Sequence, residues 1–263
     1  MGDAFIKYDW LDGGHGTISY QQALVVSCNS CFYDMGYVLD EMDPDFLPFT
    51  ARQFGLGQPT GIELPEEAGL IPDNEWKLQT QGEGWSRGDA VNMAIGQGFV
   101  LVTPLQMVDI MAAIANGGTL YQPTLIDRIG AGGGAPEEPT PAQIRGELPL
   151  SPENLATIQE ALWRVANTQS GTAAYRFEGL PIVVAGKTGT AEAPPRDPHA
   201  WFVGYAPAEP YTLRDGRVIE EPEIAIIVMI ENAGEGSDVA APIFRRLVEM
   251  YYGITPQARL PWE

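Results

Sequence analysis

The stretch "LPIVVAGKTGTAEA", Leu180–Ala193, joins a β-branched run to a motif of one cation, two hydroxyls and a glycine. Isoleucine, valine and threonine favour extended backbone, so the stretch predicts a β-strand that carries Lys187. Thr188 and Thr190 offer hydroxyl donors, and Gly189 removes bulk where a ligand backbone approaches. Such a strand suits a carboxylate at the end of an extended peptide. Taken alone, the tripeptide K-T-G is more simply explained as an ordinary strand with a solvated lysine.

The flanking segments indicate an antiparallel sheet backed by helices. "HAWFVGYAP" (199–207) and "EIAIIVMIEN" (223–232) read as two further strands, and a helix is predicted over 242–252. Upstream, Thr103 with Pro104 and Gln106 forms a capping box for one helix, and Ser151 begins another. The first half of the chain is mainly helical, so the predicted fold class is α+β, a helical part packed on an antiparallel sheet.

Composition and charge narrow the possible functions. The chain has 263 residues, 44% of them hydrophobic, which is typical of a globular protein and is enough for one sizeable domain or two small ones. Its formal net charge of −20 disfavours binding to nucleic acid. The longest apolar run, 224–230, is too short to span a membrane, and the first ten residues do not resemble a signal peptide. A loop-rich insert is predicted around 55–90 and a low-complexity loop at 130–143.

A second motif changes the interpretation of K-T-G. Ser27 and Asn29 form S-x-N upstream of Lys187, and serine acyl-transfer enzymes that react with penicillin pair an S-x-N type of element with K-T-G. Around these two motifs, most of residues 9–250 resembles one family, the class B penicillin-binding proteins of the elongation type. The stretches that carry the resemblance are "GGHGTISYQQALVVSCNSCFYDMG", "FGLGQPTGIELPEEAGLIP", "GDAVNMAIGQGFVLVTPLQMVDIMAAIANGG", "SGTA", "AGKTGTAEA", "HAWFVGYAP" and "AAPIFRRL".

The resemblance implies a fold, an activity and a set of roles. The fold is that of penicillin-binding proteins and serine β-lactamases, and the activity is peptidoglycan DD-transpeptidation, which cross-links stem peptides through a serine acyl-enzyme. By motif, Ser27 relays a proton toward the leaving amine, Asn29 binds the substrate amide, and Lys187 keeps the site electropositive. Thr188 and Thr190 bind the terminal carboxylate, and the Thr190 backbone N–H forms half of the oxyanion hole.

One motif of the family is absent from the printed sequence. The family nucleophile lies in S-x-x-K, but the residues three before the three lysines are Ala4, Asn74 and Val184. In the family this motif precedes S-x-N, so we expect it upstream of Met1. The resemblance then makes residues 1–263 a single but partial transpeptidase domain, truncated at its N-terminus. The chain alone is then expected to be catalytically incomplete. The alternative is a non-catalytic module that binds stem peptides.

The resemblance also implies partners and a location for the parent protein. The expected ligands are peptidoglycan stem peptides and β-lactams, and the expected protein partner is a membrane glycosyltransferase of the elongation machinery. The parent would work on the outer face of the cytoplasmic membrane, although no signal or anchor is recognisable in this chain. No cofactor is required for the reaction.

The two cysteines, Cys28 and Cys31, raise separate possibilities. A redox or metal protein built on this C-x-x-C pair finds no support elsewhere in the sequence, and Cys31 is interpreted as core packing. A disulfide between residues three apart on a helix is predicted to be geometrically poor. Asp9, His15 and Cys28 offer one oxygen, one nitrogen and one sulfur ligand, a set suited to structural zinc. Some members of the resembled subgroup carry zinc here, with an aspartate further upstream as fourth ligand. The competing interpretation is that His15 makes a hydrogen bond within its glycine-rich turn and Cys28 is a small packed residue.

Overall fold

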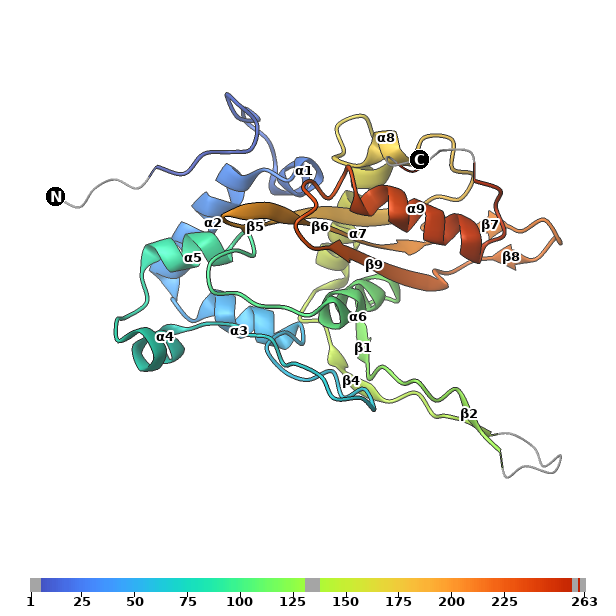
Figure 1. Cartoon of the computed structure of the whole chain (residues 1–263), viewed down its shortest axis with the longest axis horizontal. Coiled ribbons are helices and arrows are strands. Elements are labelled where there is room, and N and C mark those ends of the chain that lie inside the picture. The colour runs from blue at the N-terminus through green and yellow to red at the C-terminus, as the bar shows by residue number, and fades with distance from the viewer. Residues whose placement is uncertain (1–5, 131–137, 257–259, 261–263) are drawn as a thin grey trace.

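The structure is a computed structural model that describes residues 6–130, 138–256 and 260. Its centre is an antiparallel sheet in the order β5-β6-β9, formed by β5 (Ala185–Ala193), β6 (Arg196–Ala206) and β9 (Ile224–Ile230). The predicted strands and their antiparallel succession are confirmed, and β5 lies at an edge (Figure 1). Within the described residues, the motif strand is therefore paired on one side only, along β6.

The C-terminal helix α9 (Ala240–Tyr251) covers one face of the sheet (Figure 1). Its Phe244 packs on Phe202 of β6 with ring centroids 4.7 Å apart, and Phe177 of the short helix α8 (Ala174–Phe177) completes the aromatic cluster. All three rings are buried, so this cluster supplies a large share of the apolar burial that holds α9 to the sheet.

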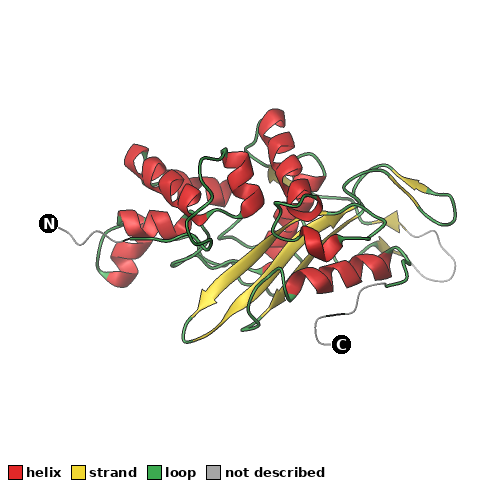
Figure 2. Ribbon diagram, turned by 90° about the horizontal axis from the view of Figure 1, so that it is seen from above, coloured by secondary structure: helices red, strands yellow, loops and turns green. Residues whose placement is uncertain are grey.

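The opposite face carries α6 (Pro104–Ala115) and α7 (Pro152–Asn167). Both begin as predicted: Thr103 caps α6 in a capping box with Gln106, and Ser151 caps α7. Figure 2 shows strands between helices on both sides, with further helices gathered toward the end where the chain begins. The predicted α+β class is confirmed.

The helices that the structure describes in the helical part are α1 (Tyr20–Val26), α2 (Asn29–Met42), α3 (Phe46–Gln53), α4 (Asn74–Gln81) and α5 (Arg87–Met93). The last two fall inside the segment 55–90 that was predicted to be loop-rich, so irregular structure is confined to 55–73 and the turn between them. Asp73 caps α4 and a Ser86–Asp89 capping box starts α5. The buried Lys77 joins the two helices through a 2.6 Å contact with Asp89, a tertiary interaction that local sequence does not reveal.

The described residues also form small two-stranded sheets: β1 (Thr119–Tyr121) with β4 (Ile144–Glu147), β2 (Arg128–Ile129) with β3 (Glu138–Pro139), and β7 (Tyr211–Thr212) with β8 (Val218–Ile219). In the predicted loop 130–143, residues 131–137 lie outside the described residues, while 138–139 pair with β2. No helix in the described part of the chain is long and apolar enough to cross a bilayer.

Candidate active site

The two predicted motifs meet in space. Lys187 on β5 donates a hydrogen bond of 2.8 Å from Nζ to Ser27 Oγ, although the residues are 160 positions apart. A second bond of 3.0 Å ties the same ammonium to the Thr188 carbonyl. The contact places the S-x-N turn directly against the K-T-G strand.

Local backbone geometry aims Ser27 at this lysine. Ser27 ends α1 in the left-handed region, at φ 55° and ψ 45°, a conformation that costs a non-glycine residue about 1–3 kcal/mol. Its N–H bonds back to the last turn of α1, and Cys28 then caps α2. Asn29 opens α2, and its side chain makes no hydrogen bond with any described residue. That amide is available to a ligand.

Burial makes the protonated form of Lys187 less stable. Removal from water lowers the pKa of this lysine from 10.5 to about 8. Its hydrogen-bond partners are the neutral Ser27 and Thr188 oxygens, so the protonated form lacks a carboxylate to offset the burial. Because the pKa stays above 7, the ammonium still predominates at neutral pH and keeps the site electropositive.

The threonines of the motif are already engaged. Thr188 Oγ1 lies 2.7 Å from Thr172 Oγ1, and Thr190 Oγ1 donates a 2.7 Å bond to Glu235 Oε2. Gly189 faces a close neighbour on β6, since a Cβ there would stand 3.2 Å from Trp201 Cβ. The substrate-binding residues predicted from sequence therefore lie together, but a carboxylate from the chain itself sits on the Thr190 hydroxyl.

Sequence reasoning missed three residues of this site. Thr172 and Gln97 belong to the stretches "SGTA" and "AIGQG" that carried the resemblance, which is the signal that could have found them. Gln97 donates a 3.3 Å bond to the Thr190 carbonyl. Because the N–H and C=O of one residue point to the same side of an antiparallel strand, the Thr190 N–H also faces that side. Glu235 lies in a loop after β9 and had no such signal.

The three predicted metal ligands converge beside the S-x-N turn. One ligand atom from each of Asp9, His15 and Cys28 lies within 4.8 Å of the other two. His15 Nε2 is 3.1 Å from Asp9 Oδ1, so His15 pairs with the aspartate rather than within its own turn. Burial alone would raise the pKa of Asp9, but hydrogen bonds from the Ser30 backbone and hydroxyl outweigh it and hold that pKa below its usual value.

The prediction for the cysteine pair was wrong. Cys28 and Cys31 are joined in a disulfide, with their Cα atoms 5.6 Å apart, within the range that a disulfide spans. The prediction assumed that both residues lie on the helix. Instead Cys28 is the N-cap of α2, with extended backbone, and only Cys31 is helical. Cys31 is also half-buried rather than part of the core.

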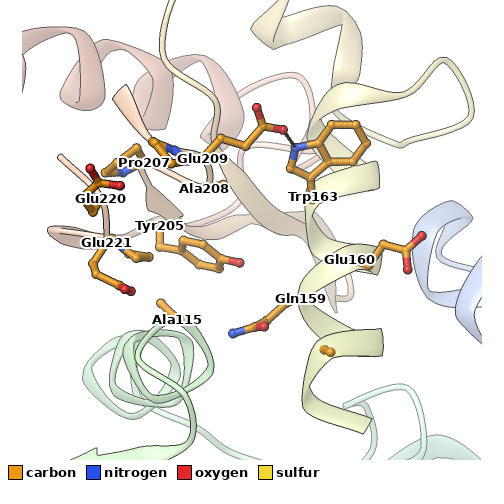
Figure 3. Close-up of a pocket in the computed structure, with 13 residues that line it drawn as sticks. Ala115, Gln159, Glu160, Trp163, Tyr205, Pro207, Ala208, Glu209, Glu220 and Glu221 are labelled. Atoms are coloured by element: carbon orange, nitrogen blue, oxygen red, sulfur yellow. Dashed lines mark hydrogen bonds between the residues drawn. The ribbon is translucent and has the colours of Figure 1, made fainter. Parts of the chain in front are cut away.

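A hollow of about 490 Å³ lies elsewhere on the α6–α7 face of the sheet (Figure 3). Tyr205 on its wall pairs with Ala185, two register positions along the strand from Lys187. The rim carries four carboxylates, Glu160, Glu209, Glu220 and Glu221, and the lining includes neither Ser27 nor Lys187. So acidic a rim disfavours a ligand that ends in a carboxylate, and the motif site remains the candidate.

Comparison with known proteins agrees with the geometry. Residues 4–249 match the family model of the penicillin binding protein transpeptidase domain. The chain is 34% identical over 269 residues to the peptidoglycan D,D-transpeptidase MrdA of Salmonella typhimurium, covering 95% of this chain and 40% of the relative. The chain thus spans less than half the length of that relative.

Solved structures show the same fold. The penicillin-binding protein PBP2 of Helicobacter pylori, solved in a complex with MreC, superposes with a TM-score of 0.75 at 30% identity, over 92% of this chain and 42% of that one. A chain from a peptidoglycan synthase complex, described as coordinating polymerization and crosslinking, gives 0.76 at 32% identity, over 96% and 41%. The chain belongs to the penicillin-binding protein transpeptidase family, on its elongation-type PBP2/MrdA branch.

Proposed function

We propose that this chain is the part of a peptidoglycan DD-transpeptidase that binds the stem peptide and relays protons, within a longer parent protein. The observation that carries the proposal is the 2.8 Å contact between Lys187 Nζ and Ser27 Oγ, which joins the two motifs. An ammonium held at a serine hydroxyl can pass a proton toward a leaving amine, as the resemblance implies for Ser27.

The substrate roles follow from what each group can donate. The Thr188 and Thr190 hydroxyls bind the C-terminal carboxylate of the stem peptide, and the Lys187 charge favours that anion. The Thr190 N–H, on the strand side that Gln97 reaches, supplies one oxyanion-hole donor. Asn29, whose amide bonds to no described residue, holds the substrate amide.

The proposal assigns the nucleophile to the parent protein. No S-x-x-K occurs in the 263 residues, and the proposal places the serine that forms the acyl-enzyme in the rest of the parent. The parent works on the outer face of the cytoplasmic membrane with a membrane glycosyltransferase; support comes from the likeness to a chain of a peptidoglycan synthase complex. The second candidate, a non-catalytic stem-peptide-binding module, is favoured by the same absence of S-x-x-K.

The domain also holds a structural zinc ion on Asp9, His15 and Cys28. The donor set, one oxygen, one nitrogen and one sulfur atom, is typical of structural zinc, and its convergence supports the fit. Zinc would fix the loop before α1 to the start of α2. A Cys28 thiolate is needed for this, because a disulfide sulfur does not ligate zinc in its place.

Penicillin labelling of the parent protein tests the transpeptidase assignment. Ser27→Ala and Lys187→Ala are expected to slow labelling by a fluorescent penicillin at least about 100-fold, the scale at which general acid–base groups contribute. Ser151→Ala is the control, because it removes the α7 cap at a cost of about 1 kcal/mol without touching the site. Unchanged labelling in both site variants would refute the catalytic assignment. If penicillin labels no serine of the parent protein, the non-catalytic stem-peptide-binding module is the function that remains.

A further inference from the structure

The Cys28 sulfur atom has two sets of partners that exclude one another. On one side Cys31 lies at the third position of α2, joined to Cys28 by the disulfide. On the other side Asp9 Oδ1 and His15 Nε2 lie within 4.8 Å of the same sulfur. Cys28 is 1% exposed, so its sulfur is shielded from solvent. It can bond either to Cys31 or to a metal ion held with Asp9 and His15, but not to both.

We propose that the Cys28–Cys31 pair is a redox switch that decides whether the Asp9–His15–Cys28 site holds a metal ion. This inference rests on the zinc site of the proposed function, and it adds that the redox state of the cysteine pair controls whether the site binds zinc. Only the reduced pair provides a thiolate at Cys28, and a thiolate is the form that ligates metal. Oxidation removes one of three ligands, so disulfide formation and metal binding oppose each other, each weakening the other by the same factor.

The exchange balances with a small-molecule disulfide such as glutathione disulfide as oxidant. The metal-bound Cys28 thiolate and the Cys31 thiol lose two electrons and form the Cys28–Cys31 bond. The glutathione disulfide bond breaks to give one thiol, which takes the Cys31 proton, and one thiolate. The divalent metal ion is released. In the reverse direction a dithiol reductant opens the bond, and the metal ion captures the Cys28 thiolate.

The position of the switch connects it to the S-x-N motif. Cys28 stands between Ser27 and Asn29, and the loop that carries Asp9 and His15 is tied to the same turn. Trp10 Nε1 donates to the Val26 and Ser27 carbonyls at 3.2 and 3.0 Å, and Asp9 Oδ2 accepts from Ser30 N and Oγ at 3.0 and 2.7 Å. A bound metal ion would therefore add a further link between this loop and the turn that presents Ser27. Oxidation replaces that link with one between the N-cap and the first turn of α2.

Zinc release tests the proposal on the 263-residue chain. The chain is reduced, loaded with zinc, freed of excess metal and titrated with glutathione disulfide, while a colorimetric chelator reports released zinc and a thiol reagent counts free cysteines. We expect one zinc per reduced chain and one zinc released for every two thiols lost. Zinc affinity should fall at least about 100-fold on oxidation, since loss of a mere outer-shell partner costs 10- to 100-fold.

Two variants separate the steps. Cys31→Ser keeps all three ligands and cannot form the disulfide, so it should bind zinc like the wild type and retain it in glutathione disulfide. His15→Gln should bind zinc poorly in both redox states. Failure of the reduced wild type to bind zinc would overturn the zinc site of the proposed function, and the switch with it. Zinc retained after both thiols are lost would overturn the switch alone.

Discussion

The Glu235 carboxylate occupies the Thr190 hydroxyl, which is the donor that the proposed function requires for a substrate carboxylate. The Glu235 loop also lies against the motif strand, because a Cβ on Gly236 would stand 2.4 Å from the Gly189 carbonyl oxygen. A carboxylate ligand must therefore displace Glu235 and overcome its charge before it reaches Thr190.

Glu235→Ala should strengthen the binding of a peptide that ends in D-Ala-D-Ala. The variant frees the Thr190 hydroxyl and removes a charge of the same sign as the ligand carboxylate. We expect the affinity for the peptide to rise by up to about tenfold, which corresponds to about 1.4 kcal/mol. Isothermal titration of the chain with the peptide and with its C-terminal amide measures the effect. Glu231→Ala, which removes an equal charge at an exposed position next to β9, is the control. An equal gain in both variants would assign the effect to net charge instead.

Lys187 makes stability depend on pH in a defined direction. The folded pKa of about 8 lies below the unfolded value of 10.5, so at pH below 8 the folded state carries the full cost of a buried charge. As pH rises from 8 to 10.5 the unfolded chain still holds this proton while the folded chain does not, and stability increases.

The difference in unfolding free energy between wild type and Lys187→Met should rise by about 3 kcal/mol from pH 7 to pH 10.5, following 1.36 kcal/mol per unit of pKa. Urea unfolding at several pH values measures it, because other titrations cancel in the difference. Lys77→Met is the control: hydrogen bonding to Asp89 raises the pKa of Lys77, so its difference should stay level to pH 10. A level difference for Lys187 as well would mean that its pKa is not depressed.

The site residues that the sequence predicted belong to short motifs, whereas those it did not predict reach the site through contacts between distant parts of the chain. Ser27 and Lys187 were assigned from two short motifs, and the structure places them in contact. Glu235 reaches Thr190 from 45 positions away with no pattern in the sequence to mark it, and Gln97 reaches Thr190 from 93 positions away, marked only by the family stretch "AIGQG". Contacts of this kind depend on the path of the whole chain. The K-T-G-T motif therefore predicts the Thr190 hydroxyl as a hydrogen-bond donor, but it does not predict that Glu235 accepts that hydrogen bond.

At the scale of elements, capped helices with a long apolar pattern were predictable, and short capped helices among turn residues were not. Thr103 and Ser151 are recognisable N-cap residues that predict α6 and α7, and both helices begin where expected. The short helices α4 and α5 also begin at caps, Asp73 and Ser86, but they lie among turn residues and are linked by the buried contact of Lys77 with Asp89. Helices this short are marginal without such packing, which is why their sequence resembles a loop.

Close packing of α2 on α5 gives a test of what holds the S-x-N helix in place. A Cβ at Gly36 would stand 2.7 Å from Ala94 Cβ and 3.0 Å from the Ala90 carbonyl oxygen. Gly36→Ala gains about 1 kcal/mol of helix propensity but forces the helices apart at a cost of about 1–3 kcal/mol. We therefore expect a net loss of about 1 kcal/mol in unfolding free energy by urea denaturation.

The matched control is Gly88→Ala in the first turn of α5. Gly88 is exposed, and an added Cβ would meet only Ser86 Oγ at 3.6 Å, an ordinary contact. This variant should leave stability unchanged or raise it by up to about 1 kcal/mol. If Gly36→Ala stabilises the chain as much as Gly88→Ala does, α2 and α5 are not packed as closely as these distances indicate.

For the whole molecule, the site is an electropositive point in a strongly acidic chain. The net charge of −20 repels anions in general, so a carboxylate ligand gains only from the local field of Lys187 and the threonine hydroxyls. The acidic hollow of Figure 3, on the same face of the sheet, cannot substitute for it. Under the proposed function, binding of the stem peptide and formation of the acyl-enzyme are therefore separable, since the 263 residues hold the S-x-N and K-T-G motifs and no S-x-x-K.

The 263-residue chain should not be acylated by a β-lactam. Ser27 is the serine that Lys187 contacts, but its hydroxyl accepts the ammonium hydrogen bond, and at pH 7 a protonated lysine cannot act as the base that activates it. Mass spectrometry after incubation with benzylpenicillin at pH 7 should show the unmodified mass, and a full-length member of the family that carries S-x-x-K, treated in parallel, should show one adduct. A covalent adduct on Ser27 in the isolated chain would contradict the relay role and make Ser27 itself the nucleophile, with Lys187 as its base.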